Sequence, residues 1–295
     1  MALLTAIVPI GLKHRENNLI SQWSEIANTF SRELKIIIIE DLGTDLKTNF
    51  CPLIFELSNM ETVCGNFNSP GRSRNMGLSM ANSKWVSFWD ADDVPNVVNF
   101  IEMVKFADSS KYDIAVGKFS KFSNFIGVSR EDYKNNDLKR FLFEPGLWRM
   151  SFRLNSLKNN KFENLSMGED QLFLLDLEFY KKHIYFYQDV VYKYQTKSPF
   201  QLTNSEAVNQ IVQFLNLVRL RLEKNTLPTD YIAANMISKI MMTGLVRTKW
   251  RNKSVVVCIY LRIARINIRF AIKMLRYAPL IGFRIVRKRL VLIYK

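Results

Sequence analysis

Acidic residues are absent from the C-terminal tail of this 295-residue chain. Between Tyr231 and Lys295 the sequence contains 15 Lys and Arg residues and no Asp or Glu. The remaining 27 cations balance all 27 acidic residues, so the formal net charge of +15 belongs to the tail alone. This division excludes a chain that is basic throughout, and the tail needs an explanation of its own.

Cysteine is scarce, and a targeting sequence is not apparent. The three cysteines, Cys51, Cys64 and Cys258, show neither metal-ligand spacing nor a disulfide framework, which suits a reducing cytosol. The first residues lack a basic region and a cleavage site, and their apolar run has the length of a strand, so we expect no signal peptide. A hydrophobic fraction of 48% nevertheless predicts a folded protein.

Short apolar runs alternate with helical patterns in the first part of the chain. The runs at 3–10 and 35–39 predict buried strands, and residues 17–30 have apolar positions at helical spacing. Residues 51–57 are a candidate third strand, and residues 183–194 predict two strands joined by a turn. Unbroken apolar strands are typical of a parallel sheet, so the fold class is α/β.

The pattern changes to purely helical at residue 204. Helices are predicted at 207–222 and 231–246. We therefore expect an α/β domain over residues 1–203 and a helical region over residues 204–295.

A buried strand is predicted at Trp85–Trp89, and it ends in three carboxylates. These are Asp90, Asp92 and Asp93, followed by Pro95. In an open α/β sheet the ligand crevice lies at the carboxyl ends of the strands. Because like charges this close repel one another, the pattern indicates a counter-charge, most simply a divalent cation that bridges to phosphate.

Two further polar segments fall at predicted helix starts. Arg72 and Arg74 follow a Pro-Gly turn, where their charges would suit an anion; an ordinary basic helix surface is an equally good interpretation. Glu169 and Asp170 follow Gly168 and precede the amphipathic run LFLLDLEFY. Helix capping alone would explain that pair, but the upstream acidic strand favours a functional interpretation.

Within the tail, five cations recur at helical spacing. Steps of 3, 4, 4 and 3 residues place them on one helical stripe: Arg262, Arg265, Arg269, Lys273 and Arg276. A transmembrane span is disfavoured, because each central Arg costs about 2.5–3.5 kcal/mol. The tail at 250–295 instead fits a helix that lies on an anionic membrane surface. The alternatives are a basic helix packed on the core and a nucleic-acid-binding surface, the latter disfavoured because aromatic residues are not interleaved.

Several segments between residues 3 and 200 follow one another in a familiar order. They are TAIVPI, IIIIEDLG, GRSRNMGL, WVSFWDADD and the later GED. Together they resemble the family 2 glycosyltransferases, inverting enzymes of bacterial surface-glycan synthesis with the GT-A fold. GRSRNMGL is similar to the family's ARN-x-GL signature, WVSFWDADD to the strand that ends in its D-x-D motif, and GED to the pair whose Asp is the catalytic base. The resemblance implies a mixed, Rossmann-like sheet flanked by helices, to which the basic C-terminal extension is added.

The resemblance also implies a binding site for a nucleotide-sugar, most commonly a UDP-sugar. Glu40 and Asp41 would contact the base and the ribose, in a pocket shaped by Pro9. Glu40 stands where the family usually has Asp, and the carboxylate is retained. Arg74 and Asn75 would hold phosphate or ribose groups.

For the chemistry, the resemblance implies direct displacement at the anomeric carbon. Asp90 and Asp92, helped by Asp93, would place Mg²⁺ or Mn²⁺ and the nucleotide. Asp170 would take the proton from the acceptor hydroxyl, and Glu169 would orient the base or the acceptor.

The chain departs from the family in one respect. Many relatives carry a His near residues 197–203, where this chain reads KSPFQLT. A third protein ligand to the metal is therefore not indicated, and Lys193 or Lys197 would supply positive charge in its place.

The tail and the resemblance together suggest a setting for the reaction. We expect a glycan or polyprenyl-linked acceptor of capsule, O-antigen or lipopolysaccharide synthesis, and a cytoplasmic protein peripheral to the inner face of the cell membrane. A metal-dependent phosphohydrolase of nucleotide-sugars is one alternative, but its D-x-D would close the first strand, which here ends near Pro9. A non-catalytic membrane- or nucleic-acid-binding module is another, and it leaves the ordered carboxylates unexplained.

Overall fold

The chain forms two compact units. One comprises Met1–Asn164 and Leu177–Gln201, and the other comprises Leu165–Asp176 and Leu202–Lys295. Residues 165–176 are thus grouped with the C-terminal helices, although the expected α/β domain included them; the boundary at residue 203 stays a prediction. The computed structural model describes residues 2–11, 19–43, 58–123, 126–131, 137–157, 159–165, 167–195, 207–247 and 250–277.

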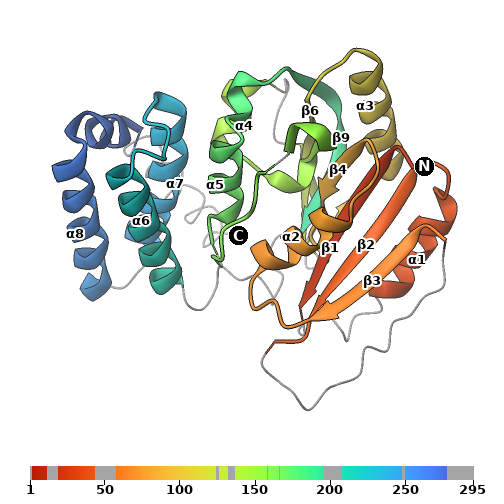
Figure 1. Ribbon diagram of the computed structural model, residues 1–295, viewed down its shortest axis with the longest axis horizontal. Coiled ribbons are helices and arrows are strands. Elements are labelled where there is room, and N and C mark those ends of the chain that lie inside the picture. Colours follow the sequence, from red (N-terminus) through yellow and green to blue (C-terminus); the bar gives the residue numbers. More distant parts are fainter. Residues whose placement is uncertain are drawn as a thin grey trace. The chain divides into compact units, whose positions relative to one another are not determined.

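A mixed sheet organises the first unit, and nine strands of it lie in the described residues (Figure 1). In spatial order they are β3 (Met60–Gly65), β2 (Leu34–Asp41), β1 (Leu4–Gly11), β4 (Trp85–Phe88), β8 (Met150–Arg153), β6 (Ile114–Ser123), β9 (Ile184–Gln195) and β5 (Val94–Pro95), with β7 (Ile126–Glu131) on β6. The first four strands are parallel, and β8 introduces antiparallel pairing on both of its sides. The predicted mixed sheet with flanking helices is therefore confirmed.

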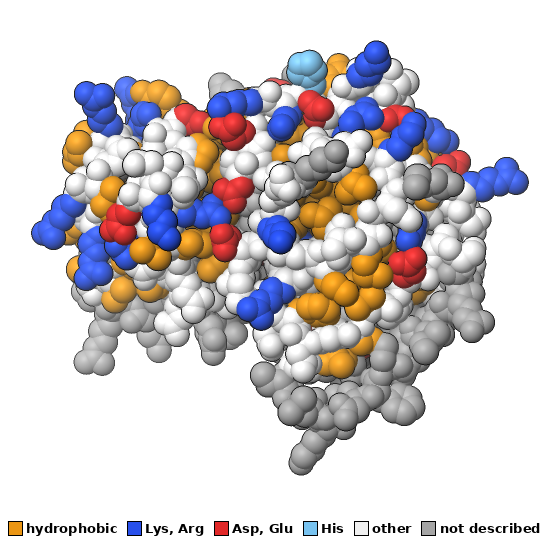
Figure 2. Space-filling view, in the orientation of Figure 1, with side chains coloured by type: hydrophobic (Ala, Val, Ile, Leu, Met, Phe, Trp, Pro, Cys, Tyr) orange, Lys and Arg blue, Asp and Glu red, His pale blue; other side chains and the backbone are white. Residues whose placement is uncertain are grey.

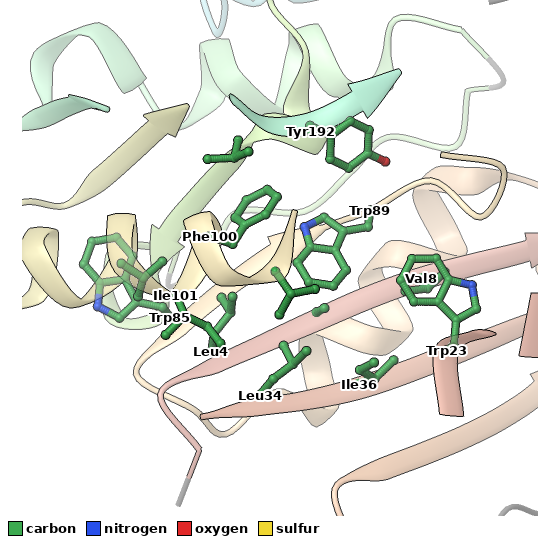
Figure 3. Close-up of a cluster of buried hydrophobic side chains, with 14 of the residues drawn as sticks. Leu4, Val8, Trp23, Leu34, Ile36, Trp85, Trp89, Phe100, Ile101 and Tyr192 are labelled. Atoms are coloured by element: carbon green, nitrogen blue, oxygen red, sulfur yellow. The ribbon is translucent and has the colours of Figure 1, made fainter. Parts of the chain in front are cut away.

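Helices cover both faces of this sheet. Helices α1 (Leu19–Thr29) and α3 (Val97–Ser109) share one core with alternate residues of β1, including Leu4 and Val8 (Figure 3). Helix α2 (Pro70–Met80) meets the opposite face, where a Cβ on Gly77 would lie 2.4 Å from Cγ2 of Ile7. This glycine lets the backbone of α2 approach β1 closely. Shorter helical segments are α4 (Leu138–Phe143) and the 3₁₀ turns Leu147–Arg149, Leu154–Leu157 and Phe179–Lys181.

Two strand predictions differ from the structure. Residues 184–195 form the single strand β9, so the predicted turn inside 183–194 is wrong. The register of β9 against β6 shifts between Val116 and Phe119, and this bulge accommodates the polar residues that looked like a turn. The candidate strand 51–57 lies outside the described residues, and the third strand that is described is β3.

The second unit is helical in its described residues. It contains α5 (Glu169–Asp176), α6 (Ala207–Glu223), α7 (Tyr231–Arg247), α8 (Trp250–Ile266) and a further helical segment at 268–277. Helices α6, α7 and α8 pack on one another through buried residues such as Phe214, Ile237 and Ile259. None of the described helices is both long enough and apolar enough to cross a membrane.

The tail bends at Asn267, although the sequence predicted one continuous helical stripe. Oδ1 of Asn267 accepts a hydrogen bond from the N–H of Phe270 and so caps the segment 268–277. The Tyr260 hydroxyl donates to the carbonyl of Ala271 over 3.1 Å. A straight helix would separate these residues by about 16 Å, beyond the reach of a Tyr side chain. The prediction of a single stripe is therefore wrong, and the five cations lie on two helices.

Candidate active site

The three carboxylates Asp90, Asp92 and Asp93 lie on a turn directly after β4. Strand β4 pairs with β1 up to Ile7↔Phe88, so the turn follows the parallel strands at their carboxyl edge. Asp90 and Asp92 are half-buried, whereas Asp93 is only 3% exposed. The acidic turn thus lies where an α/β sheet commonly binds its ligand.

Arg74 supplies a positive charge to this turn. Its Nη2 lies 2.9 Å from Oδ1 of Asp90, and its side chain is 10% exposed. Ser69 caps α2 by accepting a hydrogen bond from the N–H of Arg72, and this start places Arg74 one turn into the helix. The guanidinium also lies 5.7 Å from the ring centroid of Phe162. An arginine of the predicted anion-binding segment therefore neutralises the first Asp of the turn.

Asp93 is the most deeply buried carboxyl of the turn. Burial raises the pKa of its carboxyl to about 9, and the negative charges of Asp90 and Asp92 act in the same direction. A hydrogen bond of 2.6 Å from the N–H of Gln195 to Oδ1 opposes the rise. The buried carboxyl of Asp93 is therefore harder to ionise than an exposed carboxyl.

Two carboxylates of the turn fit a divalent cation. Among the described residues, no three His, Cys, Asp or Glu side chains converge as a metal site. Asp90 and Asp92 nonetheless offer the hard oxygen donors that Mg²⁺ and Mn²⁺ prefer, and both are partly open to solvent. Mg²⁺ is commonly held by one or two carboxylates together with phosphate oxygens and water. The residues present therefore suit a cation that arrives with a diphosphate, and Asp93 as a third ligand stays a prediction.

The residues expected around the base lie at the same edge of the sheet. Glu40 and Asp41 end β2 opposite Ile10 and Gly11 of β1, next to Pro9. The proline is tolerated in this central strand because its nitrogen faces the side where β4 has already ended. Glu40 is fully buried, whereas Oδ1 of Asp41 accepts hydrogen bonds from the N–H groups of Gly43 and Phe67. Asp41 thus binds the backbone just after β2, at Gly43, and just after β3, at Phe67.

Cys64 is disulfide-bonded. The expectation of a chain without disulfides is therefore wrong. Chain spacing does not reveal which sulfurs the fold brings together. Cys64 pairs with Glu40 across β3 and β2, and its Sγ lies 3.2 Å from Oε2 of Glu40.

Asn75 is engaged by the backbone of a distant loop. Its Nδ2 donates to the carbonyl of Phe162 over 2.9 Å, and its Oδ1 accepts from the N–H of the same residue over 2.8 Å. Asn75 therefore holds Phe162 beside Arg74. A direct contact of Asn75 with phosphate or ribose stays a prediction.

Glu169 and Asp170 occupy the first turn of α5 in the second unit. The preceding Gly168 has a φ of +84°, and a Cβ there would lie 2.5 Å from the ring of Phe214, so only glycine suits this position. Glu169 is buried, and Oδ1 of Asp170 accepts from the N–H of Gln171 over 2.9 Å. Asp170 thus accepts a hydrogen bond from an N–H group in the first turn of α5. Its convergence with Asp90 stays a prediction, because the two carboxylates belong to different units.

Sequence reasoning missed two contacts of the acidic turn. The Tyr192 hydroxyl accepts a hydrogen bond from the N–H of Asp90 over 2.9 Å, and Gln195 binds Asp93. Both partners come from β9, 102 residues further along the chain. A tyrosine in an aromatic strand carries no signal that separates this position from ordinary packing.

Residues 14–183, more than half of the chain, match the model of the family described as Glycosyl transferase family 2. The chain belongs to this family. The family 2 resemblance drawn from the ordered motifs is therefore confirmed.

Two curated relatives are glycosyltransferases whose names refer to poly(ribitol-phosphate). Poly(ribitol-phosphate) beta-N-acetylglucosaminyltransferase TarS of Staphylococcus aureus (strain MW2) is 27% identical over 201 residues, and the match covers 64% of this chain and 34% of TarS. Poly(ribitol-phosphate) beta-glucosyltransferase of Bacillus spizizenii is 25% identical over 209 residues, 66% of this chain and 32% of the relative. The family 2 chain thus spans about a third of the length of these relatives.

Solved structures of S. aureus TarS share the fold. TarS 1–349 in complex with UDP-GlcNAc gives a TM-score of 0.68 at 16% identity and covers 98% of this chain and 92% of that one. The longer TarS structure gives 0.63 at 16% identity and covers 96% of this chain and 55% of that one. The α/β architecture with its C-terminal helices is therefore the fold of that transferase.

Proposed function

We propose that this protein is a metal-dependent inverting glycosyltransferase that moves a sugar from a UDP-sugar to a hydroxyl of a bacterial surface glycopolymer. The observation that carries the proposal is the Asp90–Asp93 turn, paired with Arg74 at the ligand-binding edge of a family 2 sheet. UDP and UDP-GlcNAc, bound in the TarS structures of the same fold, support the choice of donor.

The donor half of the site is assigned to the first unit. Glu40 and Asp41 would receive the base and the ribose beside Pro9. Arg74 would direct N–H groups of its guanidinium to the diphosphate while it holds Asp90. Asp90 and Asp92 would hold Mg²⁺ or Mn²⁺, which supplies Lewis-acid stabilisation of the departing diphosphate.

Asp170 and Glu169 are the residues proposed to act on the acceptor. Asp170 would take the proton from the acceptor hydroxyl while the acceptor oxygen forms its bond to the anomeric carbon. The bond from that carbon to the diphosphate breaks on the opposite side, so UDP leaves and the configuration inverts. Glu169 would orient the acceptor beside the base.

The names of the relatives narrow the class of acceptor that we propose. We propose a polyol-phosphate polymer such as poly(ribitol phosphate), with GlcNAc or glucose as the sugar. This replaces the wider sequence-based choice of capsule, O-antigen or lipopolysaccharide.

The basic tail is proposed to hold the protein on the inner face of the cell membrane. Exposed aliphatic side chains accompany the exposed arginines, and Figure 2 shows basic and hydrophobic side chains interspersed over the helical unit on the left. The aliphatic residues are Val255, Val257, Leu261, Ile266, Ile268, Ile272 and Leu275. Lys273 differs from these arginines in that its Nζ donates a hydrogen bond to the carbonyl of Thr229 over 2.7 Å. A surface of this kind suits anionic lipid headgroups above acyl chains.

A transfer assay tests the proposal. The purified chain is incubated with UDP-GlcNAc or UDP-glucose, Mn²⁺ and poly(ribitol phosphate), and both UDP release and labelled polymer are measured. We expect a β-linked product from the α-linked donor, and Asp170→Asn should abolish transfer while UDP binding is retained. Phosphate release without labelled polymer would instead support a phosphohydrolase, and wild-type transfer by Asp170→Asn would reject the catalytic base.

A further inference from the structure

Strand β9 fastens the acidic turn to the sheet at several points. Its backbone pairs with β5, which begins directly after Asp93, at Val94↔Lys193 and Pro95↔Tyr192. The N–H of Asn96 donates to the carbonyl of Val191 over 2.7 Å. Two further contacts reach the carboxylate residues themselves, from the Tyr192 hydroxyl to Asp90 and from the Gln195 N–H to Asp93. We call this set of contacts the β9 clasp.

Tyr192 is the side chain at the centre of the clasp, and its position is fixed. The residue is fully buried. Its ring stacks on Trp148 at a centroid distance of 4.7 Å and meets the edge of Phe100 at 6.4 Å. The hydroxyl therefore cannot swing away from the turn without displacing two aromatic neighbours.

The hydroxyl contacts both ends of the acidic turn. It accepts the N–H of Asp90, and it also faces the carboxyl of Asp93. Asp92 lies between these two residues, so its backbone is held by the same contacts. Removing the hydroxyl would leave the N–H of Asp90 without this acceptor, and the turn would have to move to find another.

We propose that Tyr192 is a positioning residue for the donor site: its hydroxyl holds the turn so that Asp90 and Asp92 present their carboxylates together to a cation and a nucleoside diphosphate. The inference rests on the proposed function, because it assumes that this pair binds such a ligand. Tyr192 would thus serve the donor site without touching the cation or the nucleotide. Outer contacts of metal ligands generally change metal affinity by about 10- to 100-fold when removed.

The control variant comes from the same strand. Tyr185 is a partly buried tyrosine of β9 whose ring packs on Phe106 and Tyr112, away from the acidic turn. Tyr185→Phe removes a hydroxyl from the same strand at a less buried position. It should therefore leave the acidic turn in place.

Calorimetric titration with UDP, with and without Mn²⁺, tests the proposal on the whole chain. We expect Mn²⁺ to strengthen UDP binding to the wild type and to Tyr185→Phe. In Tyr192→Phe the gain from Mn²⁺ should shrink by about 10- to 100-fold while metal-free UDP binding is unchanged. An unchanged gain, or an equal loss with and without Mn²⁺, would overturn the positioning role while the proposed function stands. A wild type that binds no UDP would overturn the proposed function and the inference with it.

A second variant covers the case in which Tyr192→Phe does not fold. Nδ2 of Asn99 donates to the carbonyl of Val190 over 2.8 Å and so ties α3 to the same clasp from outside the turn. Asn99→Ala loosens the clasp without altering Tyr192. A several-fold smaller gain from Mn²⁺ in this variant supports the proposal, and a gain equal to that of the wild type overturns it.

Discussion

Arg74 and Asp90 form the contact on which the candidate site depends most at the scale of single residues. The guanidinium is nearly buried and the carboxylate is about two-thirds buried, at 10% and 32% side-chain exposure. Removing one partner of such a pair is costly, because the other charge is left where water solvates it poorly. The pair also brings a cationic group to the edge where a diphosphate would bind.

Arg74→Ala should therefore weaken both folding and ligand binding. We expect the free energy of unfolding to fall by about 1–3 kcal/mol, because Asp90 loses a charged hydrogen bond. UDP binding should fall at least tenfold, since the phosphate contact is lost as well. Urea unfolding and calorimetry measure the two effects. Arg72→Ala removes an exposed side chain two residues earlier and should change neither quantity much; equal losses in both variants would contradict the role of the pair.

The roles of single residues were predictable from the sequence where the chemistry of the side chains alone indicates them. Clustered carboxylates after a buried strand indicate a cation or an anion partner whatever the fold, so Asp90 and Asp92 could be found from sequence. The contact of Asn75 could not be predicted, because its amide binds the backbone of Phe162, which is 87 residues away. Tyr192 and the disulfide of Cys64 escaped for the same reason, since contacts between distant segments leave no local pattern.

At the scale of elements, helix α3 is joined to two central strands at the amino edge of the sheet. Asp108 in α3 accepts hydrogen bonds from Nε1 of Trp85 on β4 and from Nη1 of Arg153 on β8. Burial would raise the pKa of Asp108, but hydrogen bonds from Trp85, Lys84 and Arg153 outweigh it and the pKa is lowered. One carboxylate thus joins a helix to two antiparallel strands.

Asp108→Asn should destabilise the first unit in a pH-dependent way. The folded protein binds the Asp108 proton less readily than the unfolded chain, so this stabilisation is present above the unfolded pKa of 3.8. It is lost as the pH falls through the lower folded value. We expect a cost of about 1–3 kcal/mol at pH 7 that shrinks below pH 4, measured by urea unfolding. A cost that is constant with pH would show that charge is not its source.

Element boundaries were predictable where apolar spacing is unbroken, and failed where the chain bends. Strands β1 and β2 and helices α6 and α7 follow directly from periodicity. The bulge in β9 reads as a turn, because polar residues interrupt its apolar pattern. The break at Asn267 was missed because cations keep helical spacing across it, while the cap depends on one side-chain amide.

The division of charge between the two parts of the sequence matters at the scale of the whole molecule. All excess positive charge follows residue 230. Helix α8 packs on α6, so deleting the chain from residue 248 would strip the core of the helical unit as well as the basic surface. Substitutions on the exposed side therefore test membrane binding more cleanly than truncation does.

Ile268→Ser with Ile272→Ser should weaken binding to anionic vesicles. These side chains are 60% and 58% exposed, so the change removes apolar surface without opening the core. We expect about tenfold weaker sedimentation with phosphatidylglycerol vesicles, and weaker binding of the wild type at high salt. Val98→Ser, at 52% exposure in the first unit, is the control. Equal vesicle binding by the double variant and the wild type would contradict the membrane surface.

The central claim is that the acidic turn binds the diphosphate of a uridine nucleotide through a divalent cation. Calorimetric titration of the whole chain with UDP, GDP and ADP in the presence of Mn²⁺ tests it most directly. We predict binding of UDP in preference to the other two, and loss of that binding on adding EDTA or in Asp92→Ala. Failure of UDP to bind with Mn²⁺ present, or UDP binding that neither EDTA nor Asp92→Ala changes, would contradict the claim.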